Sequence, residues 1–320
     1  MSFRLERRLD PDYLAHELSR DAREGLTATP KAMRSRWLWD EHGSALYERI
    51  IELPEYYLFR AEQALLESRV GEIAALTRPR TLIELGSGSS VKTTILLDAL
   101  SELERFVAVD VSDSALADAG PRLAARYPHV EVVGVVDDFE RRLPTSFEEP
   151  LVICLGSTIG ALEPRDRSAL LTAIANILGG NGALLLGLDL VKPVERIVAA
   201  YNDGEGLSAA LIGNLLPILN RQLDADFRPE KFRPEAVWNP GPERMEMFVR
   251  SLAPQTVSLR AINLVVELAE GESLRTEIST KFRREGVERE LAGAGLRLDA
   301  WWTDRAGDFA LCLARRSQGA

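Results

Sequence analysis

Segments with helical spacing of apolar residues alternate with short apolar runs from about residue 60 to residue 191, and this alternation limits the fold more than any other feature. Strands that alternate with helices imply right-handed crossovers and a parallel sheet covered on both faces. Such a sheet binds ligands beyond the carboxyl ends of its strands, where the strand order reverses. The runs that we interpret as strands are TLIELG, FVAVDVS, VEVVGVV, PLVICLG and GALLLGLDLV.

Helices are predicted for RAEQALLESRVGEIAAL before the first strand, for VKTTILLDAL and SDSALADAGPRLAARY after the first and second strands, and for the segment after PLVICLG. Pro121 lies inside SDSALADAGPRLAARY and predicts a kink or a break, whereas Pro164 suits the first turn of a helix after PLVICLG. Near the C-terminus we expect one more helix, EGVERELAGAGL, and then two strands, LRLDAWWTD and FALCLARR, joined as an antiparallel hairpin by the turn RAGD.

Beyond Val191 the pattern changes, and we expect a second domain. Two helical segments, VERIVAAYND and LSAALIGNLLPILNRQL, precede proline-rich turns and antiparallel-looking strands. In QTVSLRAINLVVEL the apolar alternation slips by one residue near Asn263, which predicts a β-bulge and a bent sheet. We therefore predict a first domain over 60–192 and 283–320, a smaller α+β substrate domain over 193–282, and a helical N-terminal segment over 1–59 that contributes to the active site.

The charge balance argues against polyanionic partners. The formal net charge is −10 and the pI is about 5.1, so the field of the protein repels nucleic acids and anionic lipid surfaces. No run reaches the roughly 20 apolar residues of a membrane span, and MSFRLERRLDPDY lacks the apolar stretch of a signal peptide. We expect a cytoplasmic monomer that acts on a small molecule, without a nucleic-acid or membrane partner.

The cysteines and histidines predict no metal site. Cys154 and Cys312 each lie inside an apolar run, LVICLG and FALCLA, which favours buried reduced thiols over a disulfide or a nucleophile. His16, His42 and His129 are far apart in the sequence and lie beside no cluster of Cys, Asp or Glu with ligand spacing.

A glycine turn follows the first predicted strand. In Glu84-Leu85-Gly86-Ser87-Gly88, the missing side chains allow backbone N–H groups and a ligand to approach each other closely. Val91 occupies the place of the third glycine of a dinucleotide fingerprint, which disfavours an NAD(P)-dependent oxidoreductase.

Three further residues suit a nucleoside ligand. Asp110 ends the next strand, where a carboxylate can accept both ribose hydroxyls, and Asp138-Phe139 ends the third strand, where an acceptor and a ring would meet an adenine. Lys92 opens the helix after the glycine turn, where the helix dipole disfavours a cation unless an anion lies nearby. Each residue alone is also explained as a tight turn, a helix cap, core or a solvated lysine, but together they mark three successive strand ends.

The sequence resembles the histidine Nα-methyltransferases of ergothioneine biosynthesis. The resemblance spans nearly the whole chain, and several of its motifs are peculiar to that family. The motifs are GLTATPKAMRSRWLWDEHGSALYERI, LPEYYLFRAE, LIELGSGSSVKTTILLDAL, VVDDFE, LGSTIGALEP, LLLGLDLVK, ERMEMFVRS, TEISTKFR and WWTDRAGDFALCLA.

The resemblance implies an α/β fold, a doubly wound Rossmann-like class I methyltransferase sheet with a closing antiparallel hairpin, and S-adenosylmethionine (SAM) as cofactor. A closing hairpin of this kind is typical of methyltransferase sheets and not of dehydrogenase sheets. The residues that match cofactor-binding positions are Gly86, Lys92, Asp110, Asp138 and Phe139, to which the glycine turn adds Ser87 and Gly88. Those that match the amino-acid pocket are Tyr56, Tyr201, Met247, Glu277 and Ser279.

The spacing of Glu277 and Ser279 agrees with that assignment, because residues two apart on a strand point to one face, roughly 7 Å apart. Glu277 would accept an imidazole N–H, and Ser279 would serve as donor or acceptor for the other nitrogen. Alternating polar residues of a half-exposed strand also commonly face solvent, and that alternative is favoured without the resemblance. Tyr56, Tyr201 and Met247 could likewise be ordinary packing residues.

Two residues depart from the family pattern. Trp39 stands where the family usually has Tyr, and Ala161, after Gly160 in GSTIGA, stands where it usually has Asn. Both positions lie, by resemblance, near the backbone end of the amino acid. We expect methylation of the α-amino group of L-histidine, up to three times, with Glu277 and Ser279 as clamps. The alternatives are a histidine ring nitrogen, another aromatic amino acid, or a non-catalytic protein that binds the cofactor.

Overall fold

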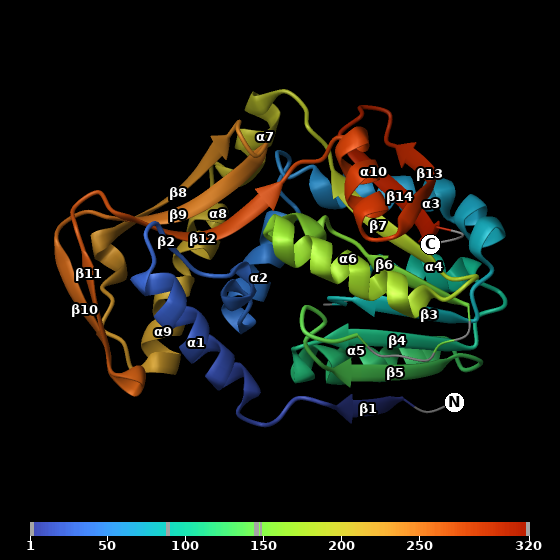
Figure 1. The fold of residues 1–320 in the computed structure, drawn as a ribbon, viewed down its shortest axis with the longest axis horizontal. Coiled ribbons are helices and arrows are strands. Elements are labelled where there is room, and N and C mark those ends of the chain that lie inside the picture. The colour runs from blue at the N-terminus through green and yellow to red at the C-terminus, as the bar shows by residue number, and fades with distance from the viewer. Residues whose placement is uncertain (1–2, 88–89, 144–146, 148, 318–320) are drawn as a thin grey trace. The chain divides into compact units, whose positions relative to one another are not determined.

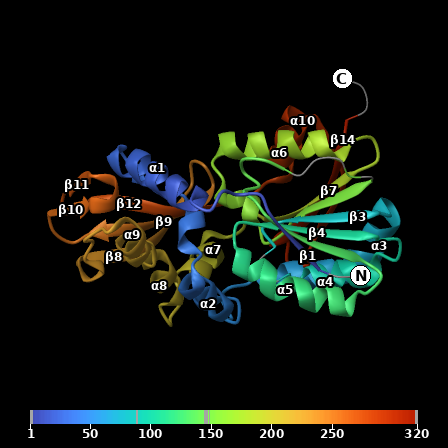
Figure 2. The same cartoon turned by 90° about the horizontal axis from the view of Figure 1, so that it is seen from below.

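The computed structural model describes residues 3–87, 90–143, 147 and 149–317, and these divide into two compact units. The first unit holds the described residues within Met1–Asp10, Leu58–Val191 and Phe282–Ala320. The second holds Pro11–Tyr57 and Lys192–Lys281. Figures 1 and 2 show the ribbon of both units from two sides.

The first unit is built on an eight-stranded sheet, in which six strands run parallel and the last two form an antiparallel hairpin. The predicted strands and the closing hairpin are thereby confirmed. The strand order reverses between β3 and β6, so the edge beyond their carboxyl ends is the topological switch point. Across the sheet the strands are β1 (Arg4–Arg7), β5 (Glu131–Val136), β4 (Arg105–Asp110), β3 (Thr81–Leu85), β6 (Pro150–Cys154), β7 (Ala183–Asp189), β14 (Phe309–Arg316) and β13 (Leu296–Thr303).

Helices cover both faces of this sheet (Figure 2). Apolar residues of α6 (Pro164–Leu178) and α10 (Arg284–Gly293) join one buried cluster with one face of the strands. Those of α3 (Leu58–Thr77), α4 (Thr93–Ala99) and α5 (Asp113–Arg126) join a second cluster on the opposite face. The central strands are therefore buried on both sides, as their continuous apolar sequences predict.

Pro121 does not break the helix that contains it. The α5 helix continues through Pro121 to Arg126. Pro121 and Ala117, whose carbonyl loses its usual partner, are both on the exposed side of the helix, so water can hydrate that carbonyl. The prediction of a break at this position is wrong.

The N-terminal residues, expected to be helical, also contribute two strands. The β1 strand pairs in parallel with β5 at the edge of the first unit's sheet, and β2 (Lys31–Ala32) pairs with β12 (Ser273–Thr280) of the second unit. Leu5 packs closely over Gly134 of β5, where a Cβ would stand 2.9 Å from Cδ1 of Leu5. This pairing joins residues far apart in the chain, so the short sequence RLER carries no local sign of it.

The second unit combines helices with a four-stranded sheet of order β2-β12-β9-β8 and a separate hairpin. The predicted helical segment LSAALIGNLLPILNRQL is divided into two helices that meet at Asn214, because Pro217 is accommodated only near the start of a helix. The helices are α1 (Tyr13–Thr27), α2 (Glu41–Ile50), α7 (Val194–Tyr201), α8 (Leu207–Gly213) and α9 (Leu215–Leu223); the remaining strands are β8 (Phe232–Asn239), β9 (Arg244–Ser251), β10 (Gln255–Leu259) and β11 (Leu264–Leu268).

The predicted bulge near Asn263 is instead a hairpin turn. The β10 and β11 strands pair antiparallel, with Leu259 opposite Leu264. A 3-10 turn, Arg260–Ile262, and Asn263 at φ +47° reverse the chain between them. The apolar alternation changes phase because the strand turns back, and Val257 and Val266 still bury the same face.

Candidate active site

The glycine turn of the first unit leaves the backbone accessible. Gly86 has a φ of +73°, a left-handed conformation that favours glycine, and its N–H donates to the Val109 carbonyl at 2.9 Å. A Cβ on Gly86 would stand 3.5 Å from Cε1 of Phe139. The first and third strand ends are therefore adjacent, and Gly86 leaves a gap over the Phe139 ring.

Ser87 carries a hydroxyl without a partner. Its side chain is buried, and Oγ has no hydrogen-bond partner among the described residues. An unsatisfied buried hydroxyl costs about 1–3 kcal/mol unless a ligand or water meets it. Ser87 therefore offers a polar contact beside Gly86. Gly88, which we also assigned to this turn, lies outside the described residues.

Glu84 stabilises the same turn through hydrogen bonds with two hydroxyl groups. It accepts hydrogen bonds from Oγ1 of Thr93 at 2.5 Å and from Oγ of Ser90 at 3.1 Å, which link β3 to the start of α4. Burial raises the pKa of Glu84 to about 7 against the opposing effect of those hydrogen bonds. Glu84 was not predicted as a site residue, although a carboxyl in an otherwise apolar strand was the available sign.

Two carboxylates end the neighbouring strands. Asp110 is half-buried, and its Oδ1 accepts from the N–H of Ser112 at 2.9 Å, while Ser112 caps α5. Asp138 is buried, and its Oδ1 accepts from the N–H of Glu140 at 3.0 Å. Because β3, β4 and β5 are parallel, both carboxylates lie on the edge that carries the glycine turn. This donor and acceptor set suits a nucleoside with free ribose hydroxyls.

Lys92 has a protein carboxylate as partner. Its Nζ is ion-paired with Glu62 of α3, which is fully buried. Glu62 also accepts from the N–H of Gly156, in the turn after β6, at 2.7 and 2.9 Å. A Cβ on Gly187 would stand 1.8 Å from Oε1 of Glu62, so Gly187 makes room for this carboxylate. Glu62 thus joins the segments that follow β3 and β6 at the switch point, and sequence reasoning missed it.

Gly160 and Ala161 belong to the first unit. They lie in a 3-10 turn, Thr158–Ala161, that follows β6. The N–H of Gly160 donates to the Ser157 carbonyl at 2.8 Å, and Gly160 is buried whereas Ala161 is half-buried.

The second unit contains a series of aromatic rings that pack edge-on against one another: Trp39, Tyr47, Tyr56 and Tyr201. Tyr56 is buried and packs edge-on against Tyr201, with centroids 6.3 Å apart, and against Tyr47, with centroids 6.0 Å apart. Trp39 packs edge-on against Tyr47 at 5.4 Å and stays 42% exposed. Burial and then Tyr47 raise the pKa of Tyr56 well above its usual value, so Tyr56 remains a neutral phenol. Tyr47 connects two of the predicted residues and was not itself predicted.

Glu277 and Ser279 lie on one face of β12. Glu277 is opposite Met247 of β9, and Ser279 is opposite Met245, and both methionines are buried. The strand is irregular between Arg275 and Glu277, and the resulting register shift places Glu277 opposite Met247. Directly opposite residues of an antiparallel pair share a face, so Glu277 and Ser279 lie on the face of these buried methionines, where both are half-buried rather than fully exposed.

The Glu277 carboxyl differs from the other acidic groups of its sheet. It accepts no hydrogen bond from any described residue, although Glu235 and Glu246 of the same sheet are paired with arginines. Burial raises the pKa of Glu277 to about 7, with Lys281 acting in the opposite direction. The group is therefore poised to accept a hydrogen bond from a ligand.

Lys281 completes this cluster, and sequence reasoning missed it. Its Nζ donates to Oη of Tyr201 and to Oγ of Ser279, each at 2.7 Å, and those two oxygens are 2.8 Å apart. The Lys281 side chain is buried, with Nζ 4.6 Å from the centroid of the Tyr201 ring. A lysine two residues beyond Ser279, in phase with Glu277, was the available sign.

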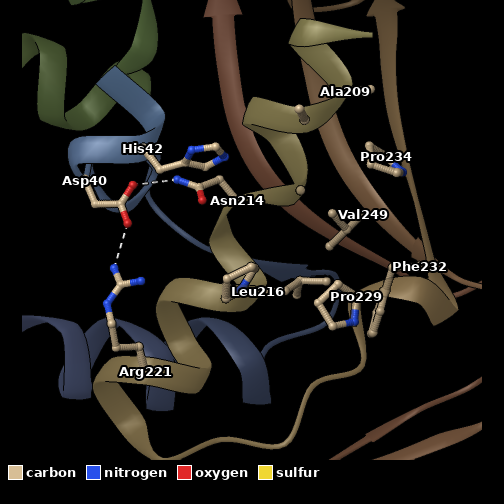
Figure 3. A pocket seen from close by; sticks show the side chains of 13 residues that line it. Asp40, His42, Ala209, Asn214, Leu216, Arg221, Pro229, Phe232, Pro234 and Val249 are labelled. Carbon is tan, nitrogen blue, oxygen red and sulfur yellow. Dashed lines mark hydrogen bonds and ion pairs between the residues drawn. The ribbon is translucent and has the colours of Figure 1, made fainter. Parts of the chain in front are cut away.

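A cavity of about 380 Å³ lies elsewhere in the second unit (Figure 3). Asp40 and Asn214 line it, and Asp40 accepts from Nδ2 of Asn214 at 2.8 Å and from Arg221 at 2.6 Å. Burial alone would raise the pKa of Asp40, but these bonds and one from the N–H of Gly43 lower it. Of the described residues that line this cavity, none is a predicted site residue. We therefore interpret it as a packing gap beside the hydrogen bonds of Asp40 with Asn214 and Arg221, which stabilise the fold.

Cys154 and Cys312 are free and buried, as predicted, and burial raises the pKa of each thiol to about 12. In residues 3–87, 90–143, 147 and 149–317, no three His, Cys, Asp or Glu side chains are grouped as metal ligands would be. Within the same ranges no helix has the length and apolar character to cross a membrane.

The family model, the relatives and the solved structure that this chain resembles are all methyltransferases. Residues 18–316 match a family model described as histidine-specific methyltransferase, SAM-dependent. A protein of Mycolicibacterium smegmatis named histidine N-alpha-methyltransferase is 46% identical, covering 99% of this chain and 100% of that protein. A Mycobacterium tuberculosis protein of the same name is 44% identical, covering 96% and 97%. A SAM-dependent methyltransferase structure from Clostridium acetobutylicum has a TM-score of 0.52 at 12% identity, covering 85% and 98%, and supports the fold alone.

Proposed function

We propose that this chain, which belongs to the family of histidine-specific, SAM-dependent methyltransferases, transfers methyl groups to the α-amino nitrogen of free L-histidine, up to three times. The family membership makes the chain a SAM-dependent methyltransferase on a Rossmann-like class I fold. The position of the methyl groups is supported by the two mycobacterial relatives, whose names specify the α-nitrogen.

The residues at the switch-point edge fit the cofactor. We propose that Asp110 accepts from the ribose hydroxyls and that Asp138 and Phe139 contact the adenine. Gly86, which lacks a side chain, lets the ligand approach closely, and Ser87 contacts it through Oγ. The unsatisfied Ser87 hydroxyl supports this proposal. Lys92, which Glu62 holds in place, would meet the carboxylate of the methionine part. SAM, when bound, supplies a methyl group on a positively charged sulfur.

The observation that carries the choice of substrate is the Glu277 carboxyl. It is half-buried, has a raised pKa, and accepts no hydrogen bond from the described residues. An imidazole N–H would supply the missing donor, and Ser279 on the same face would meet the second ring nitrogen. An indole or a phenyl ring offers only one of these contacts or none, so histidine suits this pair best.

The acceptor amine must lose its proton before it can attack. None of the three histidines is a predicted site residue, and Glu277 is committed to the ring, so we propose that the proton passes to water. The chain then contributes by orientation: Glu277 and Ser279 hold the ring, and Tyr56 and Tyr201 limit the movement of the amino acid. With this division of roles, kcat/KM should rise with pH until the free amine is neutral.

A single mass-spectrometric assay tests the proposal. Purified protein is incubated with SAM and a mixture of free amino acids, and any methylated product is fragmented to locate the new groups. We expect mono-, di- and trimethylated histidine with every methyl on the α-nitrogen. A methyl group on the imidazole ring, or on another aromatic amino acid, would overturn the assignment of substrate position.

Trp39 and Ala161 give a specific reason to examine the product in this way. By the resemblance, both replace polar family residues near the backbone end of the amino acid, and the loss of an amide contact would weaken binding by about 1–3 kcal/mol. If no amino acid is methylated and SAM does not stabilise the protein against heat, then the chain is not an active methyltransferase and the proposal fails.

A further inference from the structure

Lys281 and the two hydroxyls that it contacts determine which hydrogen bonds Ser279 can still make. The ammonium of Lys281 has hydrogens to donate and no lone pair to accept. Its two contacts at 2.7 Å therefore use one lone pair on Oγ of Ser279 and one on Oη of Tyr201. The 2.8 Å contact between those oxygens is a further bond, in which one hydroxyl donates to the other.

The direction of that bond follows from the chemistry of the two hydroxyls. A phenol is a better donor than an aliphatic alcohol, and its oxygen is a poorer acceptor because its lone pairs are delocalised into the ring. We therefore assign Tyr201 as donor and Ser279 as acceptor. Oγ of Ser279 then accepts from both Lys281 and Tyr201, which fills its two acceptor positions. Its own hydrogen remains for a ligand.

We propose that Lys281 is a specificity-determining positioning residue that makes Ser279 a hydrogen-bond donor. Glu277, on the same face of β12, is the acceptor of the pair. The cluster then recognises a ring with one N–H and one bare nitrogen, which is a neutral imidazole, and disfavours a ring with two N–H groups or with none. This inference rests on the proposed function, because it concerns how the same residues hold the ring of histidine.

The burial of Lys281 supports this role. Only 2% of the residue is exposed, and removing an ammonium from water costs several kcal/mol unless its hydrogens are bonded. Two hydroxyls of the substrate region meet that requirement, and the Tyr201 ring adds a cation–π contact. Lys281 is thus held where its hydrogens are directed at the two oxygens rather than at solvent.

The first experiment determines the direction of the Ser279 bond with a ring analogue, 3-(thiazol-4-yl)-L-alanine. Its ring keeps a bare nitrogen at the position of Nδ1 and has sulfur at the position of Nε2, and the thiazol-5-yl isomer exchanges the two. The isomer that binds the wild-type protein more tightly, which under this proposal directs its bare nitrogen at Ser279, is the analogue used. We expect Ser279→Ala to weaken binding of histidine and of this analogue alike, by about tenfold, because a donor to the bare nitrogen is lost in both cases. Binding is measured as KM for histidine and as an inhibition constant for the analogue. An unchanged inhibition constant would overturn the proposal, since an accepting Ser279 has no bond with thiazole to lose.

The second experiment tests Lys281 with two variants of similar size. Lys281→Met cannot donate, whereas Lys281→Gln keeps a donor without the charge. We expect Lys281→Met to raise KM for histidine by about tenfold with little change in kcat or in KM for SAM, and Lys281→Gln to recover most of that loss. When Ser279→Ala is already present, Lys281→Met should raise KM for histidine by less than about a further twofold, because Lys281 acts through Ser279.

The results distinguish failure of the proposed function from failure of the role of Lys281. If the wild-type protein methylates no histidine, the proposed function fails. If histidine is methylated but the two substitutions are additive, or Gln behaves like Met, then Lys281 acts on the substrate directly or only supports the fold, and this inference alone is wrong. Because the analogue experiment does not alter Lys281, it tests the Ser279 donor even if the Lys281 variants do not fold.

Discussion

Each unit contains a carboxyl whose pKa burial raises to about 7, and the two carboxyls differ in their partners. Glu84, in the cofactor region of the first unit, accepts hydrogen bonds from Thr93 and Ser90. Glu277, in the amino-acid region of the second unit, accepts none from the described residues. Desolvation is the main cause of both raised pKa values. The hydrogen bonds show that Glu84 holds a turn together, whereas Glu277 is available to a ligand.

The two regions also differ in how far apart their residues lie in the sequence. The partners of Glu84 are six and nine residues away, so the glycine turn of the cofactor region is held by local contacts. In the amino-acid region, Tyr201 contacts Ser279 across 78 residues and Lys281 across 80. We therefore expect changes in the first region to act through backbone and turn geometry, and changes in the second to act through single side chains.

The largest expected effect is that of Gly86→Val. A β-branched residue at φ +73° is strained, and its side chain would fill the gap over Phe139. We expect SAM affinity, measured by calorimetry, to fall by at least about a thousandfold. Gly307→Val is the control, because Gly307 has nearly the same φ, +72°, with nothing near its missing Cβ. Equal losses of SAM affinity in both variants would show that strain alone, and not the position beside Phe139, is responsible.

The second largest effect concerns stability against pH in Glu84→Gln. Because burial raises the pKa of Glu84 to about 7, the folded protein binds more protons than the unfolded chain between about pH 4.5 and 7, so the unfolding free energy falls as pH rises through this window. The contribution of Glu84 to that fall is on the order of 3 kcal/mol. Gln does not titrate, so denaturant unfolding should show a smaller fall in the variant. An identical pH dependence in both proteins would contradict the raised pKa.

The third prediction is that Glu277→Ala raises KM for histidine by about thirtyfold and leaves KM for SAM nearly unchanged. The variant loses one hydrogen bond to a charged group, worth about 1.5–3 kcal/mol. Glu267→Ala, at an exposed carboxylate of β11, is the control and should change neither constant. Steady-state kinetics with each substrate varied in turn provides the measurement. A large loss of SAM affinity in Glu277→Ala would show that Glu277 acts in the cofactor region and not in the amino-acid region.

The smallest effect is expected for Asn214→Ala, beside the cavity of Figure 3. Asn214 donates to Asp40 and to the Leu38 carbonyl, and so joins residues from two distant parts of the second unit. Loss of these bonds should lower the unfolding free energy by about 1–2 kcal/mol. SAM affinity should not change, and KM for histidine should change less than in Glu277→Ala. A larger change in KM for histidine than in Glu277→Ala would mean that the hydrogen bonds of Asn214 also position the residues that hold the substrate.

Local patterns predicted most of the first unit and part of the second. The strands around the glycine turn, the closing hairpin and the two buried thiols were all readable from short stretches of sequence. The phase slip near Asn263 was detected but misinterpreted, because a bulge and a tight hairpin change the alternation in the same way. Only the partner strand distinguishes them.

The amino-acid sequence by itself determined the alternating sheet, the position of the glycine turn, and the carboxylates at the ends of β4 and β5, because each depends on neighbours within a few residues. Tertiary structure alone decided the partners of Lys92 and Ser279. Glu62 and Gly156 lie 94 residues apart, and Lys281 and Tyr201 lie 80 apart. Such contacts depend on which side chains are brought together when the chain folds. Burial raises the pKa of Glu277, and the contacts with Lys281 and Tyr201 determine which hydrogen bonds Ser279 can still make.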